Sequence, residues 1–151
     1  MTENRVIGLN SRLPWSLPDD WSRLKRMVQE KDIVMGRKTV ESHEAFLSKG
    51  KNIVFSRSID QMEGCTVVQD IDTLMRTQER DLYILGGSDI YRLFLPYATH
   101  MFLTIIHTSL HGDTYFPEYP MEEWHLVNQE DRFKDDRHDY DFSYMDYIRT
   151  Q

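Results

Sequence analysis

The sequence predicts a single α/β domain over residues 1–151, built on a mostly parallel mixed sheet that is antiparallel at its C-terminal edge, with helices on both faces. The length of 151 residues and the mass of 18.1 kDa leave room for one domain. Short apolar runs alternate with segments of helical period, which indicates a parallel sheet covered on both faces. The last two strand-like segments have no helix between them, which favours antiparallel pairing there.

The individual elements follow from local pattern. Apolar residues spaced three and four apart indicate helices, and short runs rich in Ile, Val and Phe indicate strands. A helix ends before Pro96, because proline cannot continue it. Helices are expected at 19–30, 39–47, 71–78 and 89–95, and strands at 32–36, 52–56, 66–68, 82–85, 101–106, 125–127 and 142–148.

Composition excludes several classes of protein. The chain carries 18 Lys and Arg against 25 Asp and Glu, so its charge of −7 argues against binding to nucleic acid or to an anionic membrane. No run approaches the ~18 apolar residues of a membrane span, and residues 1–5 lack the apolar stretch of a secretory signal. The single cysteine, Cys65, fits a reducing cytoplasm, and with no apolar interface stripe a monomer is expected.

Two adjacent carboxylates open the first helix. At 100° per residue Asp20 falls inside the apolar stripe that contains Leu24 and Met27, whereas Asp19 falls outside it and is expected to be solvated. An apolar pocket disfavours the charged form of a carboxyl group, so Asp20 is a candidate proton donor near neutral pH. The alternative is that Asp20 only complements the helix dipole in the first turn.

The loop at residues 8–13 precedes this helix and is rich in turn-forming residues. A loop of this length beside a carboxylate is a candidate lid. The alternative is an ordinary surface connection, with Trp15 packed into the core.

Two strand–glycine–helix junctions suggest a nucleotide site at the carboxyl edge of the sheet. Gly36 is followed by Arg37 and Lys38, and Arg57 follows the next strand, so their charges suit a phosphate such as a ribose 2′-phosphate. The paired glycines at 86–87 permit a tight turn that cradles a pyrophosphate, although they are not a GxGxxG fingerprint. The alternative is a set of solvated cations at helix starts. The six histidines lack metal-ligand spacing, so no metal site is expected.

A series of short motifs in a fixed order resembles dihydrofolate reductase over essentially the whole chain. The matching segments are NRVIG at 4–8, LPWSLPDD at 13–20, VMGRKTVES at 34–42, KNIV at 51–54, LGG at 85–87 with Tyr91, FLP at 94–96, LT at 103–104 and GDTYFP at 112–117. The resemblance implies an oxidoreductase that uses NADPH to reduce 7,8-dihydrofolate to tetrahydrofolate, in the one-carbon metabolism that supplies thymidylate and purine precursors.

The resemblance also implies roles for individual residues. Asp20 would bind the pterin and favour protonation of N5, Thr104 would hold this carboxylate, and Leu13 and Trp15 would shield the nicotinamide. The Gly86–Gly87 bond would match the family's cis peptide. The expected NADPH-binding residues are Ile7, Gly8, Asn10, Arg37, Lys38, Thr39, Ser56, Arg57, Gln69, Gly86, Gly87, Ser88, Asp89, Ile90 and Tyr91. The expected substrate-binding residues are Asp20, Trp21, Leu24, Lys25, His43, Leu47, Lys49, Lys51, Leu85 and Thr104.

The chain departs from the family in two places. The family has an apolar first strand, central in its sheet, just before the position of Met1, and this strand is expected to be missing here. Gly50 stands where the family has an arginine for the folate glutamate tail, and Lys49 or Lys51 would replace it only as point charges. These departures leave open a relative that binds NADPH but reduces another pterin or pyrimidine, or nothing.

Overall fold

The computed structural model describes residues 1–42 and 47–150. Contacts divide the chain into two compact units. The first unit is Met1–Ser22 together with Phe94–Gln151, and the second unit is Arg23–Leu93. A single domain over 1–151 stays a prediction. Within the described residues no helix has the length and apolar content needed to cross a membrane.

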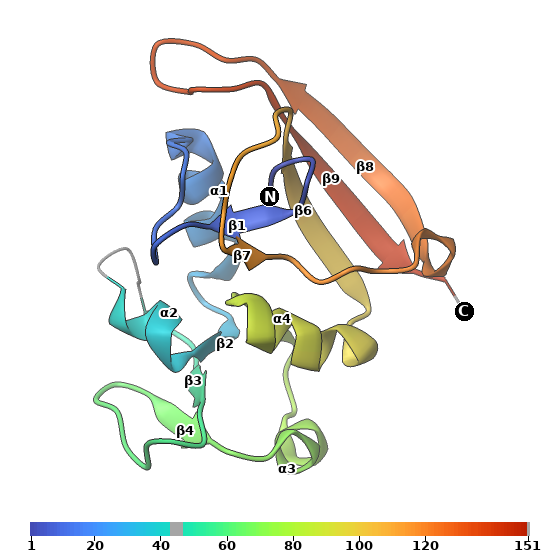
Figure 1. The fold of residues 1–151 in the computed structure, drawn as a ribbon. Coiled ribbons are helices and arrows are strands. Elements are labelled where there is room, and N and C mark those ends of the chain that lie inside the picture. Colours follow the sequence, from blue (N-terminus) through green and yellow to red (C-terminus); the bar gives the residue numbers. More distant parts are fainter. Residues whose placement is uncertain (43–46, 151) are drawn as a thin grey trace. The chain divides into compact units, whose positions relative to one another are not determined.

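The second unit contains a four-stranded parallel sheet in the order β4-β3-β2-β5 (Figure 1). Strands β2 (Asp32–Gly36), β3 (Asn52–Phe55), β4 (Thr66–Val68) and β5 (Leu82–Ile84) confirm the four predicted parallel strands. After β4 the chain passes through α3 (Ile71–Thr77) and returns to the far side of β2. The direction of strand addition therefore reverses between β2 and β5.

Burial on both sides explains why β2 and β3 read as continuous apolar runs. All four residues of β3 are buried, and so are the first four of β2. Ile33 and Met35 pack with Val28, and this cluster also receives Leu24 and Tyr83. β-branched side chains suit such a doubly covered sheet.

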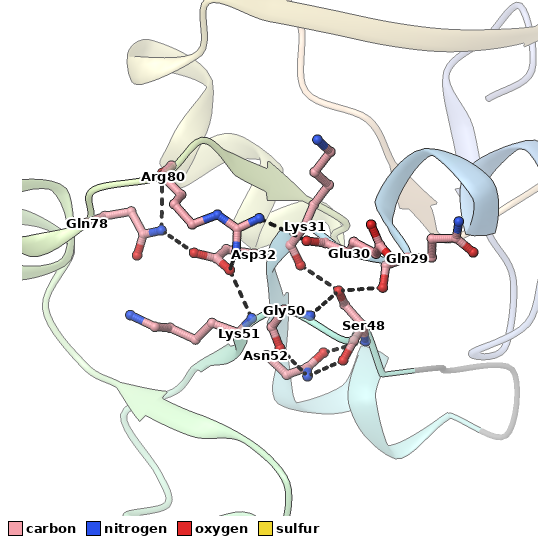
Figure 2. A network of polar contacts seen from close by, with 10 residues as sticks. All are labelled: Gln29, Glu30, Lys31, Asp32, Ser48, Gly50, Lys51, Asn52, Gln78 and Arg80. Atoms are coloured by element: carbon pink, nitrogen blue, oxygen red, sulfur yellow. Dashed lines mark hydrogen bonds and ion pairs between the residues drawn. The ribbon is translucent and has the colours of Figure 1, made fainter.

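Polar side chains tie the starts of these strands together (Figure 2). The Asp32 side chain, only 6% exposed, accepts hydrogen bonds from Lys51 N at 2.9 Å and from Gln78 Nε2 at 2.7 Å, and Arg80 Nη1 lies 3.4 Å away. Ser48 Oγ donates to the Lys31 carbonyl and accepts from Gly50 N at 3.0 Å. One buried carboxylate thus links the segments that lead into β2, β3 and β5.

The first unit contains an antiparallel sheet in the order β6-β9-β8, formed by β6 (His100–Ile106), β9 (Phe142–Arg149) and β8 (Trp124–Arg132). A two-stranded sheet pairs β1 (Val6–Gly8) with β7 (Thr114–Tyr115). Helix α1 (Pro18–Val28) begins in this unit and continues into the second. The antiparallel pairing of the final strands was predicted and is confirmed.

Several boundaries differ from the predictions. The predicted parallel and antiparallel strands lie in three hydrogen-bonded sheets of the described residues, with four, three and two strands. Thr2 forms an isolated parallel bridge with Ile106 of β6. Strand β8 extends to Arg132 because its exposed polar residues pair with β9, which periodicity cannot show. Strands β1 and β7 were missed, because three and two residues carry no periodic signal.

The helices differ from the predictions at their ends. Helix α2 covers Arg37–Glu41 rather than 39–47, and residues 43–46 lie outside the described residues. Helix α4 is Ser88–Phe94, and short 3-10 helices follow at Leu95–Tyr97 and Met121–Glu123.

We expect Asp32→Asn to lower the free energy of unfolding at pH 7 by about 1–3 kcal/mol, because an amide cannot accept from all of these donors. The backbone N–H of Lys51 holds the pKa of Asp32 below its usual value, against the opposing effect of burial. The stabilisation is therefore complete above the unfolded pKa of about 4 and is lost as the pH falls through the lower folded value. Urea unfolding at pH 7 and pH 3 measures the free energy of unfolding, with Asp81→Asn at an exposed position as the control. Equal stability of wild type and Asp32→Asn at pH 7 would contradict the prediction.

Candidate active site

The first turn of α1 places Asp20 beside β6. Thr104, in the middle of β6, donates a hydrogen bond from Oγ1 to Asp20 Oδ1 at 2.6 Å. The helix turn is closed by Asp20 N, which donates to the Leu17 carbonyl at 3.1 Å. Asp20 is half-buried. Asp20 is thus held both through its backbone N–H and through one carboxylate oxygen.

The adjacent carboxylate, Asp19, is not solvated as the helical wheel predicted. Its side chain is 33% exposed, and its Oδ2 accepts from Arg132 Nη2 at 2.9 Å. Arg137 Nη1 lies 3.8 Å from Oδ1. The prediction was wrong because both arginines come from the C-terminal part of the chain. Helix periodicity describes only residues within the helix and cannot predict such partners.

The α-ammonium group of Met1 lies close to this pair. It donates to the Thr104 carbonyl at 2.6 Å, while Ile106 N donates to the Met1 carbonyl at 2.8 Å. Burial lowers the pKa of the α-ammonium group to about 6, and the Asp20 charge acts in the opposite direction. Thr104 is therefore contacted by the terminal amino group through its carbonyl and by the Asp20 carboxylate through its hydroxyl.

The segment at residues 8–13 is a tight turn held at its base. Leu9 and Arg12 exchange backbone hydrogen bonds of 2.9 and 3.0 Å. Asn10 N donates to Asp113 Oδ2 at 3.0 Å, which holds the pKa of Asp113 below its usual value. Gly8 ends β1, where a Cβ would lie 3.3 Å from Thr114 Cβ. The connection between β1 and α1 is thus anchored to the segment that begins β7.

The two side chains that follow the turn behave differently. Leu13 is 43% exposed. Trp15 packs against the buried cluster that contains Leu17, Ile106 and Phe142. The alternative that Trp15 belongs to the core is therefore observed, and a lid role rests on Leu13 and the turn.

In the second unit both glycine junctions lie at the reversal of strand order. Gly36 ends β2, and its N–H donates to the Gly86 carbonyl at 2.8 Å just after β5. Gly86 has a φ of +99°, and a Cβ there would lie 2.9 Å from the Tyr91 ring. A Cβ at Gly36 would lie 3.1 Å from Ile90 Cγ1. The Gly86–Gly87 peptide bond is cis. Ligands of open α/β sheets bind at such a reversal, outside the carboxyl ends of the strands.

The predicted cations gather at the same edge. The register pairs Gly36 with Phe55, so Arg37 and Arg57 both follow the carboxyl ends of neighbouring strands. Arg37 contacts Glu41 at 2.8 Å and Ser58 Oγ at 3.3 Å, and Lys38 and Arg57 are exposed. Ser56 Oγ lies 3.1 Å from Ser58 Oγ. Basic and hydroxyl groups therefore line this edge as a phosphate site requires.

The remaining predicted cofactor residues of this unit have ordinary local contacts. Gln69 Nε2 donates to the Ile59 carbonyl at 3.2 Å, and Asp89 pairs with Arg92 at 2.9 Å. Ser88 to Tyr91 form the start of α4, where Tyr91 N donates to the Gly87 carbonyl at 2.9 Å. Thr39 Oγ1 lies 3.7 Å from the position of a Cβ at Gly87.

The predicted substrate residues are only partly brought together. Leu24 and Leu85 pack on the Val28 cluster. Leu47, Lys49 and Lys51 are exposed. Trp21 and Lys25 lie on α1, while Ile7 lies in β1. His43 lies outside the described residues.

Gly50 occupies a position that admits no side chain. A Cβ there would lie 2.5 Å from the Lys31 carbonyl oxygen and 3.0 Å from Asp32 Oδ1 (the network is shown in Figure 2). An arginine at this position therefore does not fit the present backbone.

A metal centre is not assembled by the described side chains: across residues 1–42 and 47–150 no three His, Cys, Asp or Glu groups come together as ligands.

Sequence comparison agrees with this geometry. A family model described as dihydrofolate reductase matches residues 1–149. The dihydrofolate reductase of Bacillus subtilis is 36% identical over 150 residues, covering 97% of this chain and 89% of that protein. The Haemophilus influenzae enzyme is 35% identical over 154 residues, covering 95% and 91%.

A solved structure has the same fold. A dihydrofolate reductase from Enterococcus faecalis, complexed with NADP(H) and RAB-propyl, superposes with a TM-score of 0.90 at 29% identity, covering 100% of this chain and 93% of that one. The fold and the sequence thus define a reductase of the mixed α/β class. The chain belongs to the dihydrofolate reductase family.

Sequence reasoning missed several groups around the carboxylate. Asp113 was noticed only within a motif, and Arg132 and His138 were not singled out. Arg132 and His138 lie in a segment that is mainly acidic, so they were not singled out, and no local pattern links them to α1. Their roles depend on contacts between residues more than 100 positions apart.

Gly86→Ala is expected to cost about 1–2 kcal/mol, because an L side chain at positive φ is strained and its Cβ meets the Tyr91 ring. Gly87→Ala is the matched control, since a Cβ there has only an ordinary contact with Thr39. Thermal unfolding of the two variants measures the difference, and equal Tm values would show that the junction does not need glycine at 86.

Proposed function

We propose that this chain catalyses the NADPH-dependent reduction of 7,8-dihydrofolate to 5,6,7,8-tetrahydrofolate. The observation that carries the proposal is the Thr104–Asp20 hydrogen bond in a chain matched over residues 1–149 by the family model. This bond holds the carboxylate to which we assign binding of the pterin. We further propose that the protein acts as a cytoplasmic monomer, with small molecules as its partners.

Asp20 is the group that handles the proton. Its carboxylate accepts from the 2-amino group and N3 of the pterin and thereby favours protonation at N5. Thr104 leaves one carboxylate oxygen available, because its hydroxyl occupies only Oδ1. Assistance to a proton transfer by a positioned side chain contributes on the order of 10²–10⁴ in rate.

The second unit supplies the groups that fit NADPH. Glycines at 36 and 86 allow close backbone approach, and added side chains there would meet Ile90 and Tyr91. Arg37, Lys38 and Thr39, with Ser56 and Arg57, hold the adenosine phosphates. NADPH, when bound, supplies the hydride that C6 of the pterin receives. Leu13 and the turn at residues 8–13 exclude water from the reacting groups.

The glutamate tail of the substrate is held less firmly than an arginine would hold it. Gly50 offers no side chain, and Lys49 and Lys51 act as exposed point charges without a bidentate fork. The loss amounts to about 1–3 kcal/mol of substrate binding. A reductase of another pterin or pyrimidine is the alternative that this departure favours.

The direct test follows NADPH absorbance with the purified protein and dihydrofolate. Oxidation of NADPH with formation of tetrahydrofolate supports the proposal. Cofactor binding without oxidation, or oxidation only with another heterocycle, would replace it with the alternative.

Asp20→Asn is expected to lower kcat with dihydrofolate at pH 7 on the order of a hundredfold or more, because the amide does not favour protonation at N5. The defect shrinks as the pH falls, because solvent then supplies the proton. Steady-state kinetics from pH 5 to pH 8 measure both effects. Thr104→Ser is the control that keeps the hydroxyl, and full turnover by Asp20→Asn would remove its assigned role.

Arg57→Gln is expected to raise KM for NADPH about tenfold, the equivalent of one charge-assisted hydrogen bond, and to leave KM for NADH unchanged. The reason is that only NADPH carries the 2′-phosphate. Arg76→Gln, on α3, is the matched control. An equal change for both cofactors would argue against a phosphate contact.

A further inference from the structure

A buried histidine from the β8–β9 connection caps the helix that carries Asp20. The His138 side chain is only 2% exposed and stacks on Phe142 with ring centroids 5.4 Å apart. Its Nε2 accepts a hydrogen bond from Asp19 N at 3.1 Å. Asp19 is the second residue of α1, so this N–H has no acceptor within the helix.

The helix lacks the usual cap from its own sequence. Leu17, which precedes α1, has no side-chain acceptor, whereas Ser, Thr, Asp or Asn normally fills this role. The imidazole therefore supplies, from 119 residues along the chain, the acceptor that the local sequence does not provide.

The partners of the ring fix its protonation. Because Nε2 accepts, the ring proton lies on Nδ1, which donates to Asp135 Oδ1 at 2.8 Å. That hydrogen bond is the largest cause holding the pKa of Asp135 below its usual value. Asp135 also accepts from the backbone N–H groups of Arg137 and His138, at 2.8 and 2.9 Å. The tight turn at 135–138 thus orients the ring.

The carboxylate of Asp19 does not compete for the ring. It lies 3.6 Å from Nε2 but pairs with Arg132 at 2.9 Å. The imidazole is left as a neutral acceptor aimed at the first turn, next to the residue whose carboxylate Thr104 holds.

We propose that His138 is a positioning residue: its neutral imidazole, oriented by Asp135, fixes the first turn of α1 and through it the Asp20 carboxylate. The proposal rests on the proposed function for the consequence it assigns to Asp20. Loss of the acceptor frees Asp19 N–H and loosens the turn that Asp20 N closes with Leu17. Misplacement of a reacting group by about 1 Å can cost on the order of 10² in rate.

The experiment compares His138→Leu, which removes the acceptor, with His138→Gln, which keeps an amide oxygen at a similar reach without an ionisable ring. We expect His138→Leu to lower kcat tenfold to a hundredfold with KM for NADPH within twofold, and to speed hydrogen exchange of the Asp19 amide. His138→Gln restores the protection of that amide and most of kcat. His125→Leu, at an exposed position of β8, is the matched control.

Two results would overturn the proposal. One is unchanged kcat in His138→Leu although the Asp19 amide exchanges faster. The other is a kcat in His138→Gln as low as in His138→Leu although its Tm is recovered, which marks a purely structural role. If His138→Leu does not fold, Asp135→Asn, at a side chain 59% exposed, tests the same ring through its orientation, and undiminished kcat there counts against it.

The two proposals fail separately. If the wild type does not oxidise NADPH with dihydrofolate, the proposed function fails, while exchange of the Asp19 amide in the two His138 variants still supports or overturns the cap.

Discussion

The hydrogen bond between Thr104 and Asp20 is the contact around which the first unit is arranged. A strand from the middle of the chain meets the start of a helix from its N-terminal part, and a 2.6 Å bond joins the hydroxyl to the carboxylate. A half-buried carboxylate can serve proton chemistry only if its orientation is set in advance. Two further hydrogen bonds act on the backbone of this same turn. Asp20 N donates to the Leu17 carbonyl, and Asp19 N donates to His138 in the β8–β9 connection.

In the second unit, backbone geometry brings the carboxyl ends of two strands together. Reversal of strand order between β2 and β5 leaves two strand ends side by side, and the Gly36–Gly86 hydrogen bond joins them. At this approach a Cβ at Gly86 would lie 2.9 Å from the Tyr91 ring at a positive φ, which favours glycine, and a Cβ at Gly36 would lie 3.1 Å from Ile90. At the opposite ends of the strands, Asp32 accepts from Lys51 in the segment before β3 and from Gln78 and Arg80 in the segment before β5. Charge-assisted bonds there hold the strand starts while the carboxyl ends stay available for ligand.

Much of this arrangement was accessible from the sequence. The strands at 32–36, 52–56, 66–68 and 82–85 were predicted because each reads as a short apolar run, and the burial of β2 and β3 explains their runs. The glycine junctions and Arg57 were predicted from their place after strands. The prediction that Asp19 is solvated was wrong. A helical wheel describes only residues of the same helix, whereas the partners Arg132 and Arg137 lie in the C-terminal part of the chain.

The sequence by itself determined the family and the parallel strands, and it predicted a role for the Asp20 carboxylate, because local motifs and runs of apolar residues carry this information. Tertiary structure alone decided how that carboxylate is held. The cap from His138, the ion pair of Asp19 with Arg132 and the exclusion of a side chain at Gly50 each join residues distant in sequence. Such contacts have no local signature, since the energy that selects them arises only when the folded chain brings the partners within hydrogen-bond or van der Waals distance.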